Sequence, residues 1–238
     1  MTDGSPDAQV GAVPPSDPAP PSDPTPQVGV GPWVGPWPDD DRLDPELLAA
    51  GDRRNVVDRY RYWRVDAVVA DLDTRRNPVH VAIENWRHDL NIGSVVRTAN
   101  AVNAAGVHVV GRRRWNRRGA MVTDRYLTVH HHGDAAALAL WCRERSLPLL
   151  GVDNTDGARP LETTDLPRDV VLLLGQEGTG LTAEALAACS AVLSIAQFGS
   201  TRSVNAGAAA AIALHAWVRR HRFGQVPGEA SDVAGQVQ

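Results

Sequence analysis

The stretch VVLLLGQEGTGL, residues 170–181, joins five consecutive apolar residues to a turn that contains three glycines. An unbroken run of Val and Leu is typical of a strand buried on both faces of a parallel sheet. A glycine-rich turn lets the backbone approach a ligand closely. The turn lacks the Lys-Ser/Thr of a Walker loop and the G-x-G-x-x-G order of dinucleotide folds. On spacing alone, its glycines fit a tight strand-to-helix turn equally well.

Other short apolar runs lie on both sides of this stretch. They are VHVAIE at 79–84, VHVVG at 107–111, PLLGVD at 148–153 and VLSIA at 192–196. Segments with helical patterning separate them, around 92–105, 134–146, 182–189 and 203–222. Short apolar strands alternating with helices predict an α/β domain, a parallel sheet flanked by helices. Thr182 is expected to cap the helix after the glycine turn.

The two ends of the 238-residue chain differ from this pattern. Residues 1–41 hold 11 of the 17 prolines and seven acidic residues without a basic one, which predicts a disordered tail. Residues 42–238 hold all 24 basic residues, every one an arginine, and 21 of the 28 acidic ones, so their net charge is +3. Residues 225–238 are expected to form a flexible C-terminal tail.

Residues 42–78 predict a helical extension before the sheet. DPELLAAG, 44–51, has Asp44 at a cap, a proline in the first turn and Gly51 at the end. RRNVVDRYRYWRVDAVVADL, 53–72, interleaves arginines with aromatic residues in a second helical stretch.

Targeting and cysteine signals point to an intracellular protein. Cys142 and Cys189 are the only cysteines, and their spacing implies neither a disulfide framework nor a zinc site. The N-terminus lacks a basic region followed by an apolar run, and no apolar stretch approaches the roughly 20 residues of a membrane span. We expect a soluble, cytoplasmic protein.

Two more stretches carry polar residues at helix starts. In DLNIGSVVRTANAVNAAGVHVVG, 89–111, the apolar residues of the helix fall on one stripe and Arg97 points away from it. Asn91 is positioned as a helix cap. In VLSIAQFGSTRSVNAGAAAAIA, 192–213, Ser203 is a candidate cap, and Arg202 and Asn205 sit where a helix start favours an anion.

These three stretches, in this order, resemble the three motifs of the SpoU/TrmH family within the SPOUT class of RNA methyltransferases. The likeness runs from about Val79 to about Arg222, within a domain expected at 79–224. It implies a C-terminal deep trefoil knot, a homodimer, and transfer of a methyl group from S-adenosylmethionine to a ribose 2'-hydroxyl in tRNA or rRNA. That chemistry requires no metal.

The resemblance also implies site residues. The catalytic candidates are Arg97, Asn91, Glu177, Ser203 and Asn205. The cofactor-binding candidates are Gly175, Glu177, Gly178, Ile195, Gln197 and Val204. A guanidinium is rarely deprotonated, so we expect Arg97 to stabilise the developing alkoxide and to hold phosphate. The third motif departs from the family, which usually has Ile-Pro-Met where this chain has Ile195, Ala196 and Gln197.

GRRRWNRRGAMVTDR, 111–125, places five arginines around Trp115 directly after a predicted strand. A charge run often forms a solvated face, but arginines with an aromatic between them also fit phosphate binding and base stacking. The predicted RNA-binding residues are Arg112, Arg113, Arg114, Arg117, Arg118 and Arg202. The run His130, His131, His132 has no metal-ligand spacing and is expected to be a loop.

Two other functions remain open from the sequence. One is a catalytically silent RNA-binding protein of the same fold, which the altered third motif would suit. The other is an unrelated nucleotide-binding α/β protein, which predicts ATP or GTP binding. The small residues of the last helix fit a dimer interface or an internal core.

Overall fold

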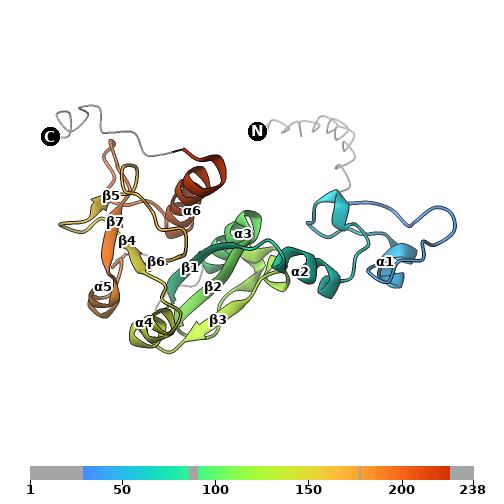
Figure 1. Ribbon diagram of the computed structural model, residues 1–238, viewed down its shortest axis with the longest axis horizontal. Helices are drawn as coiled ribbons and strands as arrows, with labels where there is room; N and C mark the ends of the chain where they lie inside the picture. The colour runs from blue at the N-terminus through green and yellow to red at the C-terminus, as the bar shows by residue number, and fades with distance from the viewer. Residues whose placement is uncertain (1–28, 86–90, 177, 226–238) are drawn as a thin grey trace, which may run out of the picture.

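The computed structural model describes residues 29–85, 91–176 and 178–225 (Figure 1). Seven strands form one sheet in the order β3-β2-β1-β6-β4-β7-β5, and every pairing in it is parallel. The strands are β1 (Asn77–Asn85), β2 (Ala104–Gly111), β3 (Val129–His132), β4 (Leu149–Val152), β5 (Arg159–Pro160), β6 (Val170–Leu174) and β7 (Ala191–Ser194). The predicted parallel α/β sheet is confirmed, with all five apolar runs in strands.

Helices cover both faces of this sheet. The side chains of α3 (Ile92–Val102) and α6 (Ala206–Phe223) share one apolar cluster with Val81 of β1. The opposite cluster contains residues of α4 (Ala135–Glu144) and α5 (Ala183–Ala188) together with Ala82. Adjacent residues of β1 therefore face different helix layers, as alternation along a strand requires.

The residues that end β4, β6 and β7 lie side by side. Val152 of β4 pairs with Leu174 of β6 on one side and with Leu193 of β7 on the other. The segments that follow these strands therefore leave the sheet at one edge. In open α/β sheets this carboxyl edge is where ligands bind.

The extension before the sheet contains less helix than the sequence predicts. It contains α1 (Pro45–Ala50), the 3-10 turn η1 (Asp58–Tyr60) and α2 (Val65–Asp73). The Asp44 cap and the end of α1 at Gly51 are confirmed. The predicted second helix over 53–72 is wrong in its first half, because the carboxylate of buried Asp52 binds the backbone N–H groups of Arg54 and Tyr62 and folds that segment into turns.

Residues 29–41, the last part of the predicted tail, are mostly exposed, but hydrogen bonds join them to the extension. Val30 and Asp52 exchange backbone hydrogen bonds of 2.9 Å, and the Tyr62 hydroxyl donates to the Gly31 carbonyl at 2.6 Å. Trp33 packs edge-on against Tyr62 with ring centroids 5.5 Å apart. Residues 1–28 and 226–238 lie outside the described residues.

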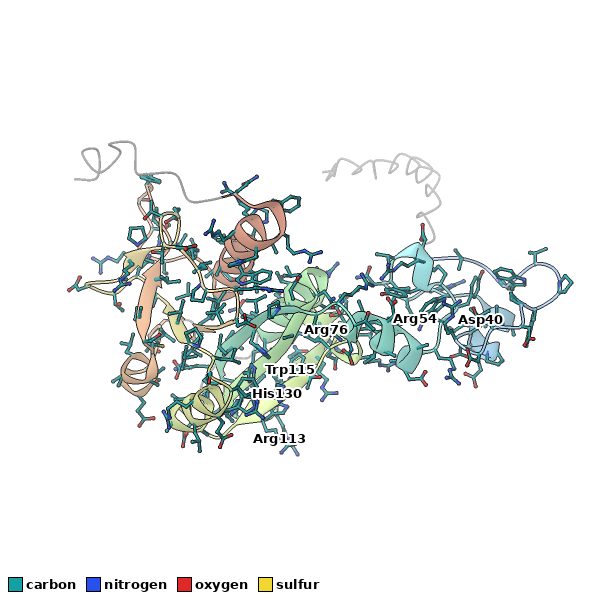
Figure 2. All side chains as sticks on the ribbon, viewed as in Figure 1. Asp40, Arg54, Arg76, Arg113, Trp115 and His130 are labelled. Atoms are coloured by element: carbon teal, nitrogen blue, oxygen red, sulfur yellow. The ribbon has the colours of Figure 1, made fainter. Side chains whose placement is uncertain are left out.

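Arg76 fastens the extension to the sheet domain (Figure 2). Its guanidinium donates to Asn103 Oδ1 at 2.9 Å and to the Tyr126 carbonyl at 2.6 Å. Tyr126 in turn belongs to a small apolar cluster with Tyr60 and Val68 of the extension. The contact is therefore a packed junction as well as a polar one.

The histidine run is a strand, which corrects the expectation of a loop. Residues 129–132 form β3 at the edge of the sheet, paired with 107–110 of β2. His130 and His132 stack beside buried His108 under Trp141 of α4. Among the described residues, no three His, Cys, Asp or Glu side chains are grouped to hold a metal. In the same residues, no helix is long and apolar enough to cross a membrane.

Candidate active site

A cavity of about 590 Å³ opens at the carboxyl edge of β4, β6 and β7. Its walls come from the three segments that leave these strands and from the start of α6. The lining residues are Val152, Asp153, Asn154, Thr155, Leu174, Gly175, Gln176, Gly178, Thr179, Gly180, Ile195, Gln197, Arg202, Ser203, Val204, Asn205, Ala206 and Ala209. Small-molecule and cofactor sites typically occupy about 300–1,000 Å³.

The cavity collects the residues predicted for cofactor binding. Gly175, Gly178, Ile195, Gln197 and Val204 line it, and so do the predicted residues Arg202, Ser203 and Asn205. Glu177 lies outside the described residues. Residues from two separate sequence segments, 175–180 and 195–205, thus line one cavity.

The glycine turn 175–180 is built by close backbone packing. A Cβ on Gly175 would clash with the backbone of Gly180, and Gly180 has φ +67°, a conformation that favours glycine. The Asp153 carboxylate accepts the Leu181 N–H at 2.7 Å, and a Cβ on Gly180 would meet the same carboxylate. The tight-turn explanation of these two glycines therefore holds, and the turn also forms a cavity wall.

A buried carboxylate supports the turn from below. Glu84, at the end of β1, is 1% exposed. Its oxygens accept the Thr182 N–H at 2.8 Å and the Thr182 hydroxyl at 2.7 Å. The Thr182 hydroxyl oxygen also accepts the Ala185 N–H, which confirms Thr182 as the cap of α5. Glu84 thus fixes the end of the glycine turn to the central strand.

Asn154 holds both ends of the third motif's loop. Its Oδ1 accepts the Ile195 N–H at 3.3 Å, and its Nδ2 donates to the Arg202 carbonyl at 3.4 Å. The Glu162 carboxylate accepts the next backbone N–H, that of Ala196, at 2.9 Å. The cavity wall at 195–202 is therefore tied to the segment after β4 although it has no proline.

Asn205, rather than Ser203, caps the last helix. Its Oδ1 accepts the N–H groups of Gly207 and Ala208, so α6 begins at Ala206. The predicted Ser203 cap is wrong, because the chain stays extended for two more residues. The Asn205 amide also donates to Asn91 Oδ1 at 2.8 Å. Asn91 precedes α3 but its side chain makes no cap hydrogen bond, which corrects that prediction.

Arg97 lies on the exposed side of α3 and does not line the cavity. The stripe predicted for α3 is confirmed, since Ile92, Val95 and Val96 are fully buried. Arg97 is thus on α3, and Asn91 directly precedes the same helix. The structure brings Asn91 and Asn205 into contact and leaves Arg97 on the neighbouring surface.

The arginine segment 112–118 packs on the same helix. A 3-10 turn, η2 (Arg117–Ala120), crosses the start of α3 so closely that a Cβ on Gly93 would lie 2.6 Å from the Gly119 Cα. All five arginines of the segment are exposed. Trp115 (Figure 2) packs against the core, and the Arg117 guanidinium lies 5.7 Å from its ring centre.

Sequence reasoning missed the residues after β4. Asp153, Asn154 and Thr155 line the cavity, and two of them fix its other walls. The signal was present, because a run of polar residues directly follows the apolar run 148–152. Polar residues at the carboxyl end of a parallel strand are site candidates by position alone.

The comparisons with known proteins agree with this arrangement. Residues 78–215 match the model of the SpoU rRNA Methylase family. The tRNA (guanosine(18)-2'-O)-methyltransferase of Escherichia coli K12 is 31% identical over 162 residues, 65% of this chain and 68% of that protein.

Solved structures give the same picture of the fold. The AdoMet complex of the SpoU methyltransferase AviRb from Streptomyces viridochromogenes aligns with a TM-score of 0.58 and 26% identity, over 63% of this chain and 60% of that one. The A. aeolicus TrmH/SpoU tRNA modifying enzyme aligns with a TM-score of 0.59 and 19% identity, over 71% and 89%. The second likeness bears on the fold alone.

Proposed function

The chain belongs to the SpoU rRNA methylase family, and from that premise we propose that it methylates a ribose 2'-hydroxyl of tRNA or rRNA with S-adenosylmethionine as methyl donor. One observation carries the proposal. The cofactor candidates of two separate motifs line a single cavity, and the cavity's rim reaches the Asn91–Asn205 contact. The order of the motifs along the chain does not by itself bring their residues together around one cavity.

The cavity suits S-adenosylmethionine in its groups as well as its volume. It has apolar wall at Val152, Leu174 and Ile195 for a flat ring, and charged side chains at Asp153 and Arg202 for the charged end of an amino acid. Glycine turns leave backbone groups near the ligand without side chains in the way. Bound there, S-adenosylmethionine supplies an electrophilic methyl group on a sulfonium.

The chain's own residues orient and activate the hydroxyl. Asn91 and Asn205 form a fixed polar pair at the cavity end of α3, where they can hold the ribose and its phosphate in line for attack. Arg97 presents a permanent positive charge on the same helix. We assign it to the flanking phosphate and the developing alkoxide. Ser203 and Glu177 complete the proposed set.

RNA reaches this rim over the arginine segment. Arg112, Arg113, Arg114, Arg117 and Arg118 are exposed on the segment that packs against the start of α3, and Arg202 lies at the cavity. Phosphate contacts dominate affinity for nucleic acids. The extension 42–78 adds a second arginine-bearing surface and is proposed as a further RNA contact.

Three further properties follow from family membership and are part of the proposal. The C-terminal part of the sheet domain threads a deep trefoil knot, the protein is a homodimer, and it acts in the cytoplasm. Ile212 of α6 is 41% exposed beside a second cavity of about 440 Å³, which supports α6 as a self-association surface. Mass measurement at micromolar concentration tests the dimer.

The decisive experiment combines binding with methyl transfer. Calorimetric titration with S-adenosylmethionine should give saturable binding, and ATP should give none. Radiolabelled cofactor should then label tRNA or rRNA in a nuclease-resistant linkage, since 2'-O-methylation blocks cleavage at that site. Binding without transfer to any RNA would favour the catalytically silent RNA-binding alternative. Binding of ATP alone would favour the nucleotide-binding one.

Arg97→Ala should separate the two measurements. Because Arg97 does not line the cavity, we expect the variant to bind S-adenosylmethionine as the parent does and to lose most methyl transfer. Arg143→Ala, at an exposed arginine of α4 on the other face of the sheet, is the matched control. Equal loss in both variants would contradict the assigned role.

A further inference from the structure

Gln197 carries an unsatisfied polar group at the cavity wall. It lies three residues after the end of β7 and lines the cavity. Its side-chain oxygen Oε1 and nitrogen Nε2 are both buried, and neither has a hydrogen-bond partner within the described part of the chain. A buried carboxamide without partners costs folding free energy, so native proteins rarely keep one without a reason.

Gln197 is not needed to hold its own loop. The backbone N–H of Ile195 is bound by Asn154, and that of Ala196 by Glu162. Asn154 also binds the Arg202 carbonyl at the far end of the loop. The loop is therefore fixed on both sides of Gln197 by other side chains, and the hydrogen-bonding capacity of its carboxamide is not used to hold it.

The chemistry of a carboxamide narrows the ligand group. It offers a donor and an acceptor side by side in one plane, which matches the amino group of adenine and the ring nitrogen next to it. A charged ligand group would be served better by Asp153 or Arg202, which line the same cavity. The apolar residues nearby suit the faces of a purine ring. They are Val152, Leu174, Ile195 and Ala209.

We propose that the Gln197 side chain is the adenine-specificity determinant of this site, pairing with the adenine amino group and an adjacent ring nitrogen of the cofactor. The inference rests on the proposed function, since it concerns the adenosine part of the same cofactor. Backbone groups alone can also bind an adenine edge. The structure assigns part of the recognition to a side chain, so the recognition can be removed by one substitution.

The test is a double-mutant cycle in which one change is made in the protein and the other in the ligand. Wild type and Gln197→Met are titrated calorimetrically with S-adenosylhomocysteine and with its 6-desamino analogue, in which hydrogen replaces the purine amino group. Methionine has similar length without a hydrogen-bond donor. We expect wild type to bind the analogue about tenfold more weakly than the parent, and Gln197→Met to bind the two within about twofold.

Two further variants serve as controls for the role of the Gln197 side chain. Gln225→Met makes the same chemical change at a glutamine whose Oε1 accepts from Arg219 outside the cavity, and should keep the tenfold preference. If Gln197→Met fails to fold, Gln197→Glu keeps the shape but cannot donate to the ring nitrogen, and should bind the parent at least tenfold more weakly.

The outcomes are distinct. Wild type that binds the parent well, with the same preference in every Gln197 variant, would overturn the side-chain assignment and leave the proposed function intact. Wild type that binds neither S-adenosylhomocysteine nor S-adenosylmethionine would overturn both. Loss of the preference in Gln197 variants alone, with a melting temperature no lower than that of wild type, would establish the assignment.

Discussion

The amide nitrogen of Asn205 lies 2.8 Å from Oδ1 of Asn91, a hydrogen bond between residues 114 positions apart. It joins the start of α6 to the start of α3 at the cavity rim. A second contact strengthens the crossing, since a Cβ on Gly207 would lie 3.2 Å from the Ser94 Cβ. The starts of the two helices, where Asn91 and Asn205 lie, are therefore fixed to each other at the place proposed for the chemistry.

Asn205 has two roles that substitutions can separate. Asn205→Asp keeps an acceptor for the α6 cap but removes the donor to Asn91, so we expect near-normal stability and a methyl-transfer rate reduced at least about tenfold. Asn205→Ala removes both and should also cost about 1 kcal/mol of unfolding free energy. Thermal melting and single-turnover transfer measure the two effects. Full activity in Asn205→Asp would show that the link to Asn91 is dispensable.

Asn154 should control cofactor affinity through the loop. Asn154→Ala releases the loop at Ile195 and at Arg202, so S-adenosylhomocysteine should bind about five- to tenfold more weakly. Protease cleavage within 197–203 should speed up, because that segment loses its anchors. Asn55→Ala, at an exposed asparagine of the extension, is the matched control. Unchanged affinity together with faster cleavage would mean that the loop does not shape the site.

The Gly93 and Gly119 contact should set the position of the arginine segment. Gly93→Ala forces η2 away from α3, because the added carbon would meet backbone atoms at 2.6–2.7 Å. We expect RNA affinity to fall several-fold while affinity for S-adenosylhomocysteine changes little. Gly133→Ala, where a Cβ would meet nothing within 4 Å, serves as the control. A selective loss of cofactor binding would contradict the role of this contact in positioning the arginine segment.

Charge reversal tests the arginine segment directly. The double substitution Arg113→Glu and Arg117→Glu should weaken RNA binding and lower the slope of log affinity against log salt by about 1–2, as expected for one or two lost phosphate contacts. Reversal of Arg143 and Arg222, also exposed, is the matched control. An unchanged affinity and slope would remove this segment from the RNA-binding surface.

The sequence predicted the sheet because its strands are unbroken apolar runs, and it missed β3 because that strand reads as histidines. The imidazoles of His130 and His132 pack against Trp141 of α4, a contact that the local sequence pattern does not predict. Ser203 was predicted to cap the last helix, yet the cap is Asn205, whose side chain also forms a tertiary hydrogen bond to Asn91. Local propensity gives way to tertiary contacts in such cases.

The candidate site was predictable in its residues but not in its supports. Motif positions pointed to Ile195, Gln197 and Val204, which do line one cavity. The residues that hold the walls, Glu84 under the turn and Asn154 at the loop, act across long sequence separations. Their roles depend on which strands are neighbours in the sheet. The order β1-β6-β4-β7 cannot be predicted from the sequence of any single segment.

The histidine cluster should make the protein sensitive to mild acid. Burial lowers the pKa of His108 to about 2 and that of His80 to about 4, with neighbouring histidines and Arg145 adding to the effect. His108 contacts His132 through Nδ1 at 2.9 Å and His80 through Nε2 at 3.1 Å, under Trp141. Burial also lowers the pKa of His130 and His132.

The sign of the effect follows from proton binding. Below pH 6.5 the unfolded chain protonates these imidazoles while the folded protein does not, so unfolding free energy falls as pH drops from about 6.5 toward 4, and it is unaffected by them above that range. Each such group adds a slope of up to about 1.4 kcal/mol per pH unit.

Chemical denaturation at pH 7.5, 6 and 5 measures this dependence of the unfolding free energy on pH. His108→Gln, which keeps hydrogen-bonding capacity without a titrating ring, should flatten the dependence, whereas His215→Gln on the exposed side of α6 should not. Equal pH dependence in His108→Gln and wild type would mean that the cluster does not titrate on unfolding as its burial requires.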